Sequence, residues 1–502
     1  TLATWVHPAH DSDGKNLEGR TIEIDLGSGQ TALFLASVDF LLGDRLPATS
    51  RALIRSEVER RIFVPFRERI ESGKDIYWWV TCDHNWNTVC LNCILGCALW
   101  LKEERGERAW HLALADDLIE YSNRGFSSSG FYTEGMSYWS SGFGNYIAIS
   151  ELVRGATGGR IDWLKVLHQN RMARYGVRME LTESLYPTFA DSHLDRQPLA
   201  WVTHWLNNRR DDQRDRTRTT TVPIDPFDDP IRQTLTSTLL NLFHTVEGEA
   251  YRMDYPLPLR EWFDDVQFLI ARPAEGSGSR LAASFIGGHN GVNHNHNDLG
   301  TFTVALNGRY LVCDPGYEIY TDRTFSKDRY LGCLLNSCGH PVPVVAGQLQ
   351  RPGPGEHRPG FGSDYRSEVL ETAFSEAEDR VVMDLSRAYR VDSLKRLERT
   401  FRYVRSKDGE VEVTDVVSFT RPEEFETALI TFADWHLAPT GAVIIGDTDG
   451  AVRVTVETEA GALVFAREVI QENSTPTRLS WRFKEPVQEA SVRFLVKPVG
   501  KS

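Results

Sequence analysis

The stretch GHNGVNHNHNDLGTFTVALNGRYLVCDPG, residues 288–316, decides how the second half of this chain folds. Its first part is rich in His, Asn and Gly and offers almost no apolar side chains to bury. Residues 301–306 then alternate apolar and polar side chains, as a half-buried strand does, and a second apolar run follows at 309–312. The Asn-Gly pair between the two runs is the strongest short-range signal for a β-hairpin. The stretch therefore predicts a polar loop followed by a hairpin.

The hairpin would place metal-binding side chain types close together. It folds Asp314 back toward the level of His296, and a later histidine, His340, follows in the chain. Two imidazoles and one carboxylate suit zinc, and three protein ligands leave a fourth position for water or another group. The alternative is a polar loop whose histidines hydrogen-bond to the backbone.

The spacing His-Asn-His-Asn-Asp-x-Gly-x-Phe, followed by Asp-Pro-Gly and a lone His, resembles the second domain of the heparinase II/III-like polysaccharide lyases. The resemblance implies that His294 faces the substrate and that His296, Asp314 and His340 hold a structural zinc ion, Zn(2+). It also implies the architecture of that family, an N-terminal incomplete α/α toroid followed by a C-terminal antiparallel β-sandwich.

Apolar periodicity divides the chain in the same order. Up to about residue 260 the spacing is helical, with one stripe at Ile54, Val58 and Ile62 and others at Leu114, Leu118, Tyr121 and at Ile231, Leu235, Leu239, Leu242. Afterwards the period is two, and strands are predicted at 266–271, 281–286, 301–306, 410–419, 452–457 and 491–496, with a second hairpin turn at 407–409. We predict an α/α toroid catalytic domain over 1–262 and a sandwich with the zinc site over 263–502. Residues 207–229 and 351–362 are predicted loops, the latter a candidate lid.

The sequence YWWVTCDHNWNTVC, residues 77–90, sets aromatic side chains beside amides and a histidine at the start of a helix. Sugar sites commonly combine such groups, and Trp79 and Trp86 are candidate substrate-binding residues. The segment again resembles the lyase toroid, where an Asn or His near this helix start contacts the uronate carboxylate. That role is carried to Asn85, with His84 and Asn87 as alternatives. A helix cap that satisfies backbone amides is the simpler interpretation.

The sequence GFYTEGMSYWSSG, residues 130–142, resembles the Glu-Gly-x-x-Tyr-Trp signature of the same lyases. In that family a toroid tyrosine acts as acid and often as base, which implies this role for Tyr138. Ser141 stands where a second tyrosine is often found, and Tyr146 is the fallback acid. Without the resemblance, a Tyr-Trp pair on a helix indicates core packing.

Further residues are candidates for the lining of a substrate cleft. His193 lies in FADSH, residues 189–193, and Trp201–Trp205 follow it, although burial explains both segments equally well. Tyr320 and Arg329 come after the hairpin as substrate-binding candidates. With Arg323 and Lys327, Arg329 would form a local basic pocket for an anionic sugar, or else all three belong to a solvated loop.

Composition limits the partners. A net charge of -14 argues against nucleic acid, and the absence of a run of about 18 apolar residues predicts no membrane span.

The odd number of cysteines, 7, excludes complete disulfide pairing. Cys90, Cys93 and Cys97 have helical spacing and are expected to pack as small apolar residues rather than bind a cluster. A cytoplasmic chain is favoured because no signal peptide is visible, or a secreted or periplasmic one if the start was trimmed, and a homodimer is left open.

The resemblance implies β-elimination at a uronic acid in an anionic polysaccharide or oligosaccharide. The weakly acidic C5 proton requires that the neighbouring carboxylate be neutralised by groups such as Asn85, after which His294 removes the proton and Tyr138 protonates O4. A glycoside hydrolase is the main alternative, since Asp83, Glu134 and Asp191 offer carboxylates. A uronate C5-epimerase, a zinc hydrolase and a non-catalytic glycan-binding protein are further alternatives.

Overall fold

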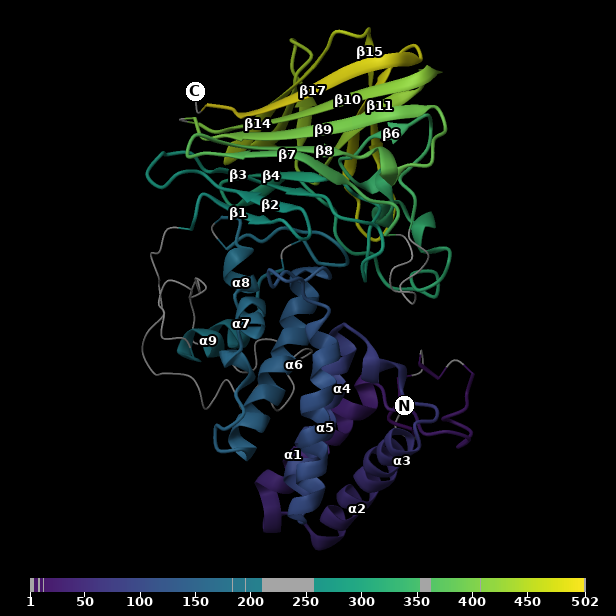
Figure 1. Cartoon of the computed structure of the whole chain (residues 1–502). Helices are drawn as coiled ribbons and strands as arrows, with labels where there is room; N and C mark the ends of the chain where they lie inside the picture. Colours follow the sequence, from purple (N-terminus) through teal and green to yellow (C-terminus); the bar gives the residue numbers. More distant parts are fainter. Residues whose placement is uncertain are drawn as a thin grey trace. The chain divides into compact units, whose positions relative to one another are not determined.

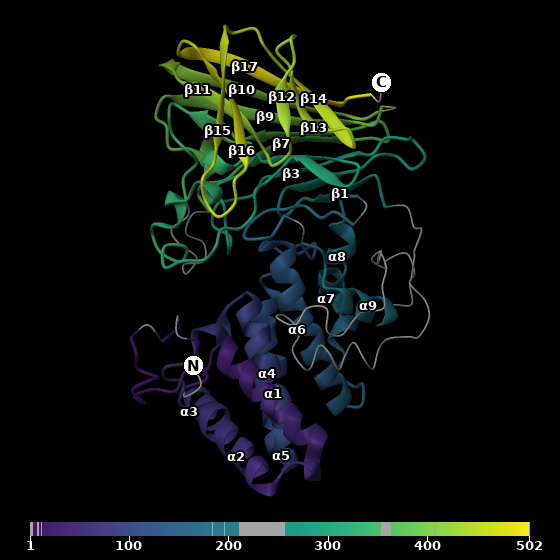
Figure 2. The same cartoon turned by 180° about the vertical axis from the view of Figure 1, so that it is seen from behind.

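The chain folds into helices first and sheets second (Figures 1 and 2). A computed structural model describes residues 4–7, 10–11, 13–182, 184–194, 196–209, 257–352, 363–406 and 408–500. Contacts divide the chain into two units. The helical unit comprises Thr1–Tyr132, Tyr138–Tyr175 and Pro198–Met253, and the β unit comprises Thr133–Ser137, Gly176–Gln197 and Asp254–Ser502.

The α-helices of the described residues all lie before residue 210. The α-helices are α1 (Leu26–Leu42), α2 (Ala48–Val58), α3 (Val64–Ser72), α4 (Asn85–Leu101), α5 (Arg105–Asn123), α6 (Gly135–Ala156), α7 (Leu167–Ala173), α8 (Tyr175–Arg178) and α9 (Ala200–Arg209), with a π-helical turn at Glu59–Phe63. Helix α4 carries no charged residue and is buried on nearly every side, as expected of a central helix. It packs against α1 and α5. Gly96 allows the close approach of α1, because a Cβ there would lie 2.5 Å from Leu33.

The predicted helical stripes are confirmed in part. Val58 and Ile62 are buried, but in α5 the buried face is His111, Ala115, Ile119 and Ser122, one position beyond the predicted stripe. Three predictions fall at least partly outside the described residues: the third stripe, the loop beyond residue 209, and residues 353–362 of the second loop. The loop prediction is wrong for residues 207–209, which are the last three residues of α9.

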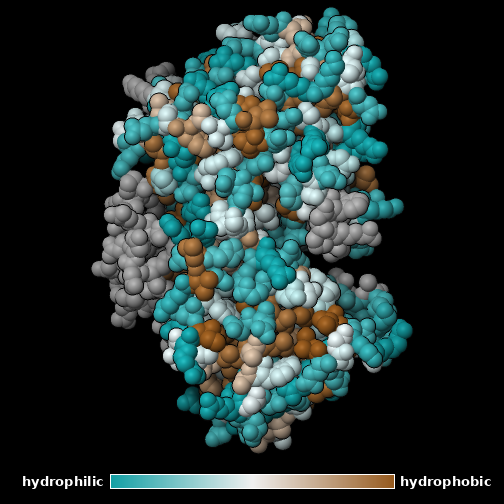
Figure 3. Space-filling view, in the orientation of Figure 1, coloured by the Kyte–Doolittle hydropathy of each residue, from teal (hydrophilic) through white to brown (hydrophobic). Residues whose placement is uncertain are grey.

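Helix α1 bears on the predicted absence of a membrane span. Among the described residues, Leu26–Arg45 is one helix long and apolar enough, by length and composition alone, to cross a membrane, with 39% of its most apolar window buried. Length and composition alone are weak evidence for a span, because a core helix passes the same criterion, so the absence of a membrane span stays a prediction. Phe34, Phe40 and Leu41 of α1 are exposed, and Figure 3 shows apolar patches on one face of the helical unit.

The β unit consists, in its described part, of three antiparallel sheets with the strand orders β1-β2-β3-β4-β5, β12-β13-β14-β17-β10-β9-β8-β7 and β15-β16-β11-β6. The strands are β1 (Arg260–Phe263), β2 (Phe268–Ala271), β3 (Leu281–Ile286), β4 (Phe302–Leu306), β5 (Arg309–Val312), β6 (Val344–Val345), β7 (Glu368–Phe374), β8 (Glu378–Asp384), β9 (Leu394–Val404), β10 (Glu410–Glu423), β11 (Phe425–Thr431), β12 (Trp435–Leu437), β13 (Val443–Asp447), β14 (Gly450–Thr458), β15 (Leu463–Val469), β16 (Thr477–Phe483) and β17 (Val487–Pro498).

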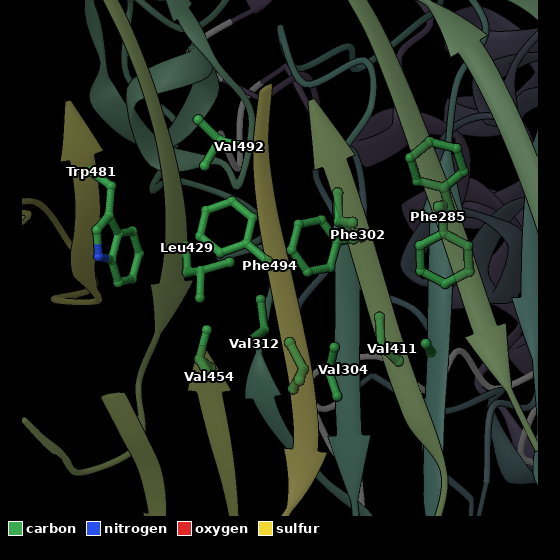
Figure 4. Packing of buried hydrophobic residues seen from close by; sticks show 14 of the residues in the cluster. Phe285, Phe302, Val304, Val312, Val411, Leu429, Val454, Trp481, Val492 and Phe494 are labelled. Carbon is green, nitrogen blue, oxygen red and sulfur yellow. The ribbon is translucent and has the colours of Figure 1, made fainter. Parts of the chain in front are cut away.

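One apolar core joins the three sheets (Figure 4). Strand β10 alternates buried and partly exposed residues, which is the pattern of a strand with one face on a core. Phe302 on β4, Leu429 on β11 and Phe494 on β17 meet in this core. The fold class predicted from the sequence, helices followed by an antiparallel sandwich, is confirmed.

Both predicted hairpins are present. Strands β4 and β5 pair across Asn307 and Gly308, whose φ angles of 54° and 71° are both positive, as the tight hairpin turn requires. Strands β9 and β10 pair across the second turn, of which residue 407 lies outside the described part. The first sheet begins at Arg260, before the predicted domain boundary at 262/263, because β1 pairs with β2.

Candidate functional site

The three predicted metal ligands meet inside the β unit. His296 lies in the loop between β3 and β4, Asp314 lies two residues beyond the end of β5, and His340 follows the 3-10 turn Ser337–Gly339. The β4–β5 hairpin brings the first two together. One ligand atom from each residue lies within 4.8 Å of the other two, and all three side chains are buried.

Unpaired atoms define the centre of this cluster. His296 Nδ1, Asp314 Oδ2 and His340 Nδ1 are buried and make no hydrogen bond within the described residues. His340 Nδ1 and Asp314 Oδ2 lie 3.2 Å apart, without the alignment of a hydrogen bond. Buried polar atoms without partners are rare and costly. Three of them facing one point fit a metal ion, which would bind all three.

The remaining polar atoms of these side chains are hydrogen-bonded and fix their orientation. His296 Nε2 lies 2.9 Å from Asp191 Oδ1, His340 Nε2 lies 3.0 Å from the carbonyl oxygen of Leu334, and the Gly316 N–H donates to Asp314 Oδ1 at 2.8 Å. Such outer contacts are typical of metal sites, since they set which ring nitrogen faces the ion.

The charges of the cluster also suit a cation. Burial lowers the pKa of His296, which keeps this ring neutral and able to ligate. Burial would raise the pKa of Asp314, but the charge of His340 outweighs burial and holds that pKa below the usual value. Burial would lower the pKa of His340, but the charge of Asp314 raises it above the usual value, so His340 must release a proton when it ligates. With that proton released, the donor set is an ionised carboxylate with two imidazole nitrogens, which suits zinc and other first-row divalent ions.

Asp191 is the centre of a second cluster beside the first. Its carboxylate lies 2.7 Å from His294 Nδ1 and 2.9 Å from His296 Nε2, and Arg329 Nη2 donates to both of its oxygens at 2.9 and 3.0 Å. The Tyr320 hydroxyl donates to it at 3.0 Å. Burial would raise the pKa of Asp191, but the charge of Arg329 and the histidine hydrogen bonds hold it well below the usual value. Sequence reasoning missed this role, because residue 191 joins the site only through the tertiary fold.

His294 lies at the accessible side of this cluster. Its side chain is 13% exposed, whereas that of Asp191 is fully buried. Its ring stacks beside Tyr320, which is 39% exposed and packs edge-on against Phe325. The φ angle of His294 is 56°, a left-handed backbone conformation that residues other than glycine seldom adopt. Such strained residues often lie in functional sites.

The predicted basic pocket is wrong for Arg329. Arg329 is fully buried and holds Asp191 and the carbonyl oxygen of Asn295, so no face of its guanidinium is left for a substrate. Arg323 pairs with Glu318 and donates to the Arg329 carbonyl oxygen. The sequence could not distinguish a solvated arginine from one that neutralises a buried carboxylate.

His193 lies near this cluster in the same unit. Its backbone N–H donates to Ser137 Oγ at 3.2 Å, and its partly buried ring packs against Tyr317 with 3.7 Å between the ring centres. It stays a candidate substrate-binding residue.

Two predicted substrate contacts in the helical unit are core residues. The Trp79 indole is buried, packs on Phe66 and Tyr77, and donates to the Ile24 carbonyl oxygen at 2.7 Å. Asn87 is fully buried, and its Nδ2 donates to the Val80 carbonyl oxygen at 2.8 Å. Neither side chain has a face left for a sugar, so both predicted contacts are corrected to structural roles.

The start of α4 nevertheless presents aromatic and polar groups. Trp78, which sequence reasoning passed over in favour of its neighbour, is 54% exposed, and its ring lies 4.7 Å from that of Trp86 and 5.7 Å from that of His84. His84 Nδ1 is 3.3 Å from Asn85 Oδ1, and the His84 side chain does not cap the helix. Asn85 is itself buried, with 8% of it exposed, so Trp78, Trp86 and His84 form the candidate binding surface of the helical unit.

The two candidate tyrosines of α6 differ in exposure. Tyr138 is partly buried, whereas Tyr146 is buried between Phe143 and Trp163. Burial raises the pKa of Tyr146 well above its ordinary value. A hydroxyl enclosed in this way cannot reach a glycosidic oxygen, so Tyr146 is corrected to a core residue.

The three helix cysteines behave as expected. Cys90, Cys93 and Cys97 are free and buried in α4, and burial raises the pKa of each thiol. They pack as small apolar groups.

Comparison with solved structures identifies the fold. A heparinase III with methylated lysines superposes with a TM-score of 0.68 at 12% identity, covering 98% of this chain and 69% of that one. A heparan sulfate lyase HepC mutant from Pedobacter heparinus gives 0.61 at 12% identity, with 98% and 72% covered, and a further heparinase III gives 0.58 at 14%, with 98% and 76% covered. No family model matches the sequence, and no curated protein matches it. The chain therefore has a heparinase III-like fold, a helical toroid followed by a β-sandwich.

Proposed function

We propose that the protein is a polysaccharide lyase that cleaves a uronic-acid-containing glycan by β-elimination. The observation that carries the proposal is His294, a partly exposed imidazole held at Nδ1 by a buried carboxylate, in a protein with a heparinase III-like fold. An imidazole whose Nδ1–H donates to a carboxylate has its basic lone pair on Nε2. Its substrate would be an anionic uronan.

The proposed chemistry assigns a separate role to each candidate residue. His294 removes the C5 proton, and Tyr138 protonates the departing O4. Asn85 and His84 neutralise the uronate carboxylate, which stabilises the enolate-like state that forms when the proton leaves. Trp78 and Trp86 would carry sugar rings on the helical unit.

We propose zinc as the ion held by His296, Asp314 and His340. When bound, zinc would supply ligation that fixes these loops rather than an activated water, because all three ligands are fully buried. In this proposal, side chains of the protein and not the metal carry out every proton transfer.

A glycoside hydrolase is less well supported. It needs two carboxyl groups on either side of the scissile bond. Asp191, one of the candidates, is fully buried and ionised, and it already accepts hydrogen bonds from two histidines, an arginine and a tyrosine. It therefore cannot donate a proton to a leaving oxygen.

The test is a panel of alginate, heparan sulfate, chondroitin, hyaluronan and plant uronans, followed by ultraviolet absorbance in ordinary and oxygen-labelled water. Elimination creates a C4–C5 double bond conjugated with the carboxylate, so absorbance should rise without solvent oxygen entering the product. His294→Gln should abolish the rise, whereas His436→Gln, an exposed histidine of the same unit, should not change it. New reducing ends that carry labelled oxygen and no absorbance would replace the lyase with a hydrolase.

A further inference from the structure

Asp191 has no role in the proposed reaction as stated, yet it contacts both the proposed base and a proposed metal ligand. Oδ2 lies 2.7 Å from His294 Nδ1, and Oδ1 lies 2.9 Å from His296 Nε2. All of these atoms belong to the β unit. One carboxylate therefore joins two histidines that are two positions apart in the chain.

The contacts determine the tautomer of each ring. An ionised carboxylate only accepts hydrogen bonds, so each facing ring nitrogen must carry the hydrogen. In neutral His294 the hydrogen is then on Nδ1 and the lone pair is on Nε2. In His296 it is on Nε2, and the unpartnered Nδ1 has the lone pair. Asp191 thus selects opposite tautomers in the two rings.

The surroundings hold Asp191 in place. Arg329, itself fully buried, contacts both carboxylate oxygens, and the Tyr320 hydroxyl donates to Oδ2. The backbone is strained on both sides of the Asp191–His294 contact. Ala190, which precedes Asp191, has a φ angle of 51°, and His294 has a φ angle of 56°. Such strain persists only where the surrounding structure over-determines a conformation.

We propose that Asp191 is a positioning residue that couples the metal site to the base, holding His294 with Nε2 toward substrate and His296 with Nδ1 toward the metal. The inference deepens the proposed lyase function and depends on it for the name of the base. A purely structural alternative is that Asp191 serves only to neutralise Arg329.

The Asp191→Asn variant separates these roles. An amide has one acceptor oxygen and one NH2 donor, so it cannot accept from both rings. One histidine must change its tautomer or lose its contact. We expect His294 to become the Nε2–H tautomer, which cannot act as a base, or His296 to lose its orientation toward the metal.

Nitrogen NMR of histidine rings in the full-length protein reports the tautomer directly. Spectra would be recorded near pH 8, above the ordinary histidine pKa of about 6.5, and assigned with His294→Gln and His296→Gln. The wild type should show Nδ1–H for His294 and Nε2–H for His296, and in Asp191→Asn at least one of these two signals should change. Zinc affinity should fall about 10- to 100-fold, as it does when an outer-shell partner is lost. The kcat on the cleaved uronan should fall by up to about 10⁴-fold, with KM little changed. This is the loss seen when asparagine replaces the aspartate that orients the histidine of a Ser-His-Asp catalytic triad.

Asp415→Asn is the matched control. Asp415 is also a fully buried carboxylate of the β unit, bound by the buried Arg399, and among the described residues no histidine is hydrogen-bonded to it. This variant should lose stability and keep the His294 tautomer and the zinc affinity. If Asp191→Asn behaves in the same way, Asp191 is only a counter-ion and the proposal fails.

Two readouts keep the proposal testable without Asp191→Asn. A wild-type His294 in the Nε2–H form would overturn it even if the variant does not fold. Removing metal from the wild type should shift the His294 Nδ1 resonance, because the shared carboxylate moves when His296 is released, and an unchanged resonance contradicts the coupling. These measurements need no turnover. If the tautomers are as expected but no uronan is cleaved, the proposed lyase function is rejected and the coupling by Asp191 stands. If a uronan is cleaved but His294 has the Nε2–H tautomer, the coupling is rejected and the lyase function stands.

Discussion

Replacing His340 by alanine should remove the metal and lower the stability of the β unit. His340 is fully buried and contributes one of the three unpaired atoms that face the cluster centre. Without it, the site is left with two protein ligands. Metal binding contributes directly to folding free energy, so stability should fall with metal content.

The magnitude follows from the buried atoms. A buried polar atom left without a partner costs about 1–3 kcal/mol. Three such atoms lie in the cluster when no ion is bound, and the opposite charges of His340 and Asp314 ease the cost for two of them. We therefore take the lower end, about 3 kcal/mol for the group. At roughly 2–4 °C per kcal/mol, the chelated wild type should melt about 6–12 °C lower than the metal-loaded protein.

Elemental analysis and thermal melts with and without a chelator test this prediction. The wild type should hold one metal per chain and melt lower with chelator, whereas His340→Ala should hold none and not respond. His436→Ala, an exposed histidine on β12, is the control and should match the wild type. One retained metal in His340→Ala, or a wild-type melt unaffected by chelator, would refute the reasoning.

Three further predictions concern single residues. Tyr138→Phe should lower kcat about 10²- to 10⁴-fold with KM little changed, as loss of a general acid does, while the buried Tyr146→Phe should leave kcat near wild type; steady-state kinetics that reverse this order would move the acid. Gly316→Ala should cost at least about 1–2 kcal/mol in a denaturant titration, because its φ is 74° and a Cβ would lie 2.3 Å from the Ser192 carbonyl oxygen; unchanged stability would contradict that geometry. Asp25→Ala should remove about 1 kcal/mol by breaking the capping box of α1. Burial would raise the pKa of Asp25, but its hydrogen bonds hold it below 3.8, so its contribution is present above that pH and is lost as the pH falls through the lower folded-state pKa. Urea titrations at neutral and acid pH should show the two proteins converging in acid.

Local chemistry made much of the β unit predictable. The Asn-Gly turn needs two residues with positive φ, and Asn307 and Gly308 supply them at low cost. The turn fixes the pairing of β4 and β5 and so carries Asp314 toward His296. No local pattern links the third ligand, His340, to the other two, so the sequence offered it only as a later histidine of a suitable type, and the resemblance implied its place in the ligand set.

Tertiary packing decided the rest. Adjacent tryptophans look alike in sequence, yet Trp79 is buried against Phe66 while Trp78 is exposed. Arg329 looked like a surface charge until its carboxylate partner, Asp191, came from a segment 138 residues earlier. Pairings at such separation leave no periodic signal, so they could not be predicted from one sequence.

The β unit does not need a metal to form its core. A single apolar cluster joins all three sheets, and it includes Phe302, Leu429 and Phe494. The ligands instead lie in loops, where His296 shares the carboxylate of Asp191 with His294. Chelation at 25 °C, well below the melting transition, should therefore leave the circular dichroism spectrum unchanged while kcat on the cleaved uronan falls, and readdition of zinc should restore it. A chelated enzyme that stays fully active would show that the metal and the base are independent, since the shared carboxylate would then transmit nothing between them.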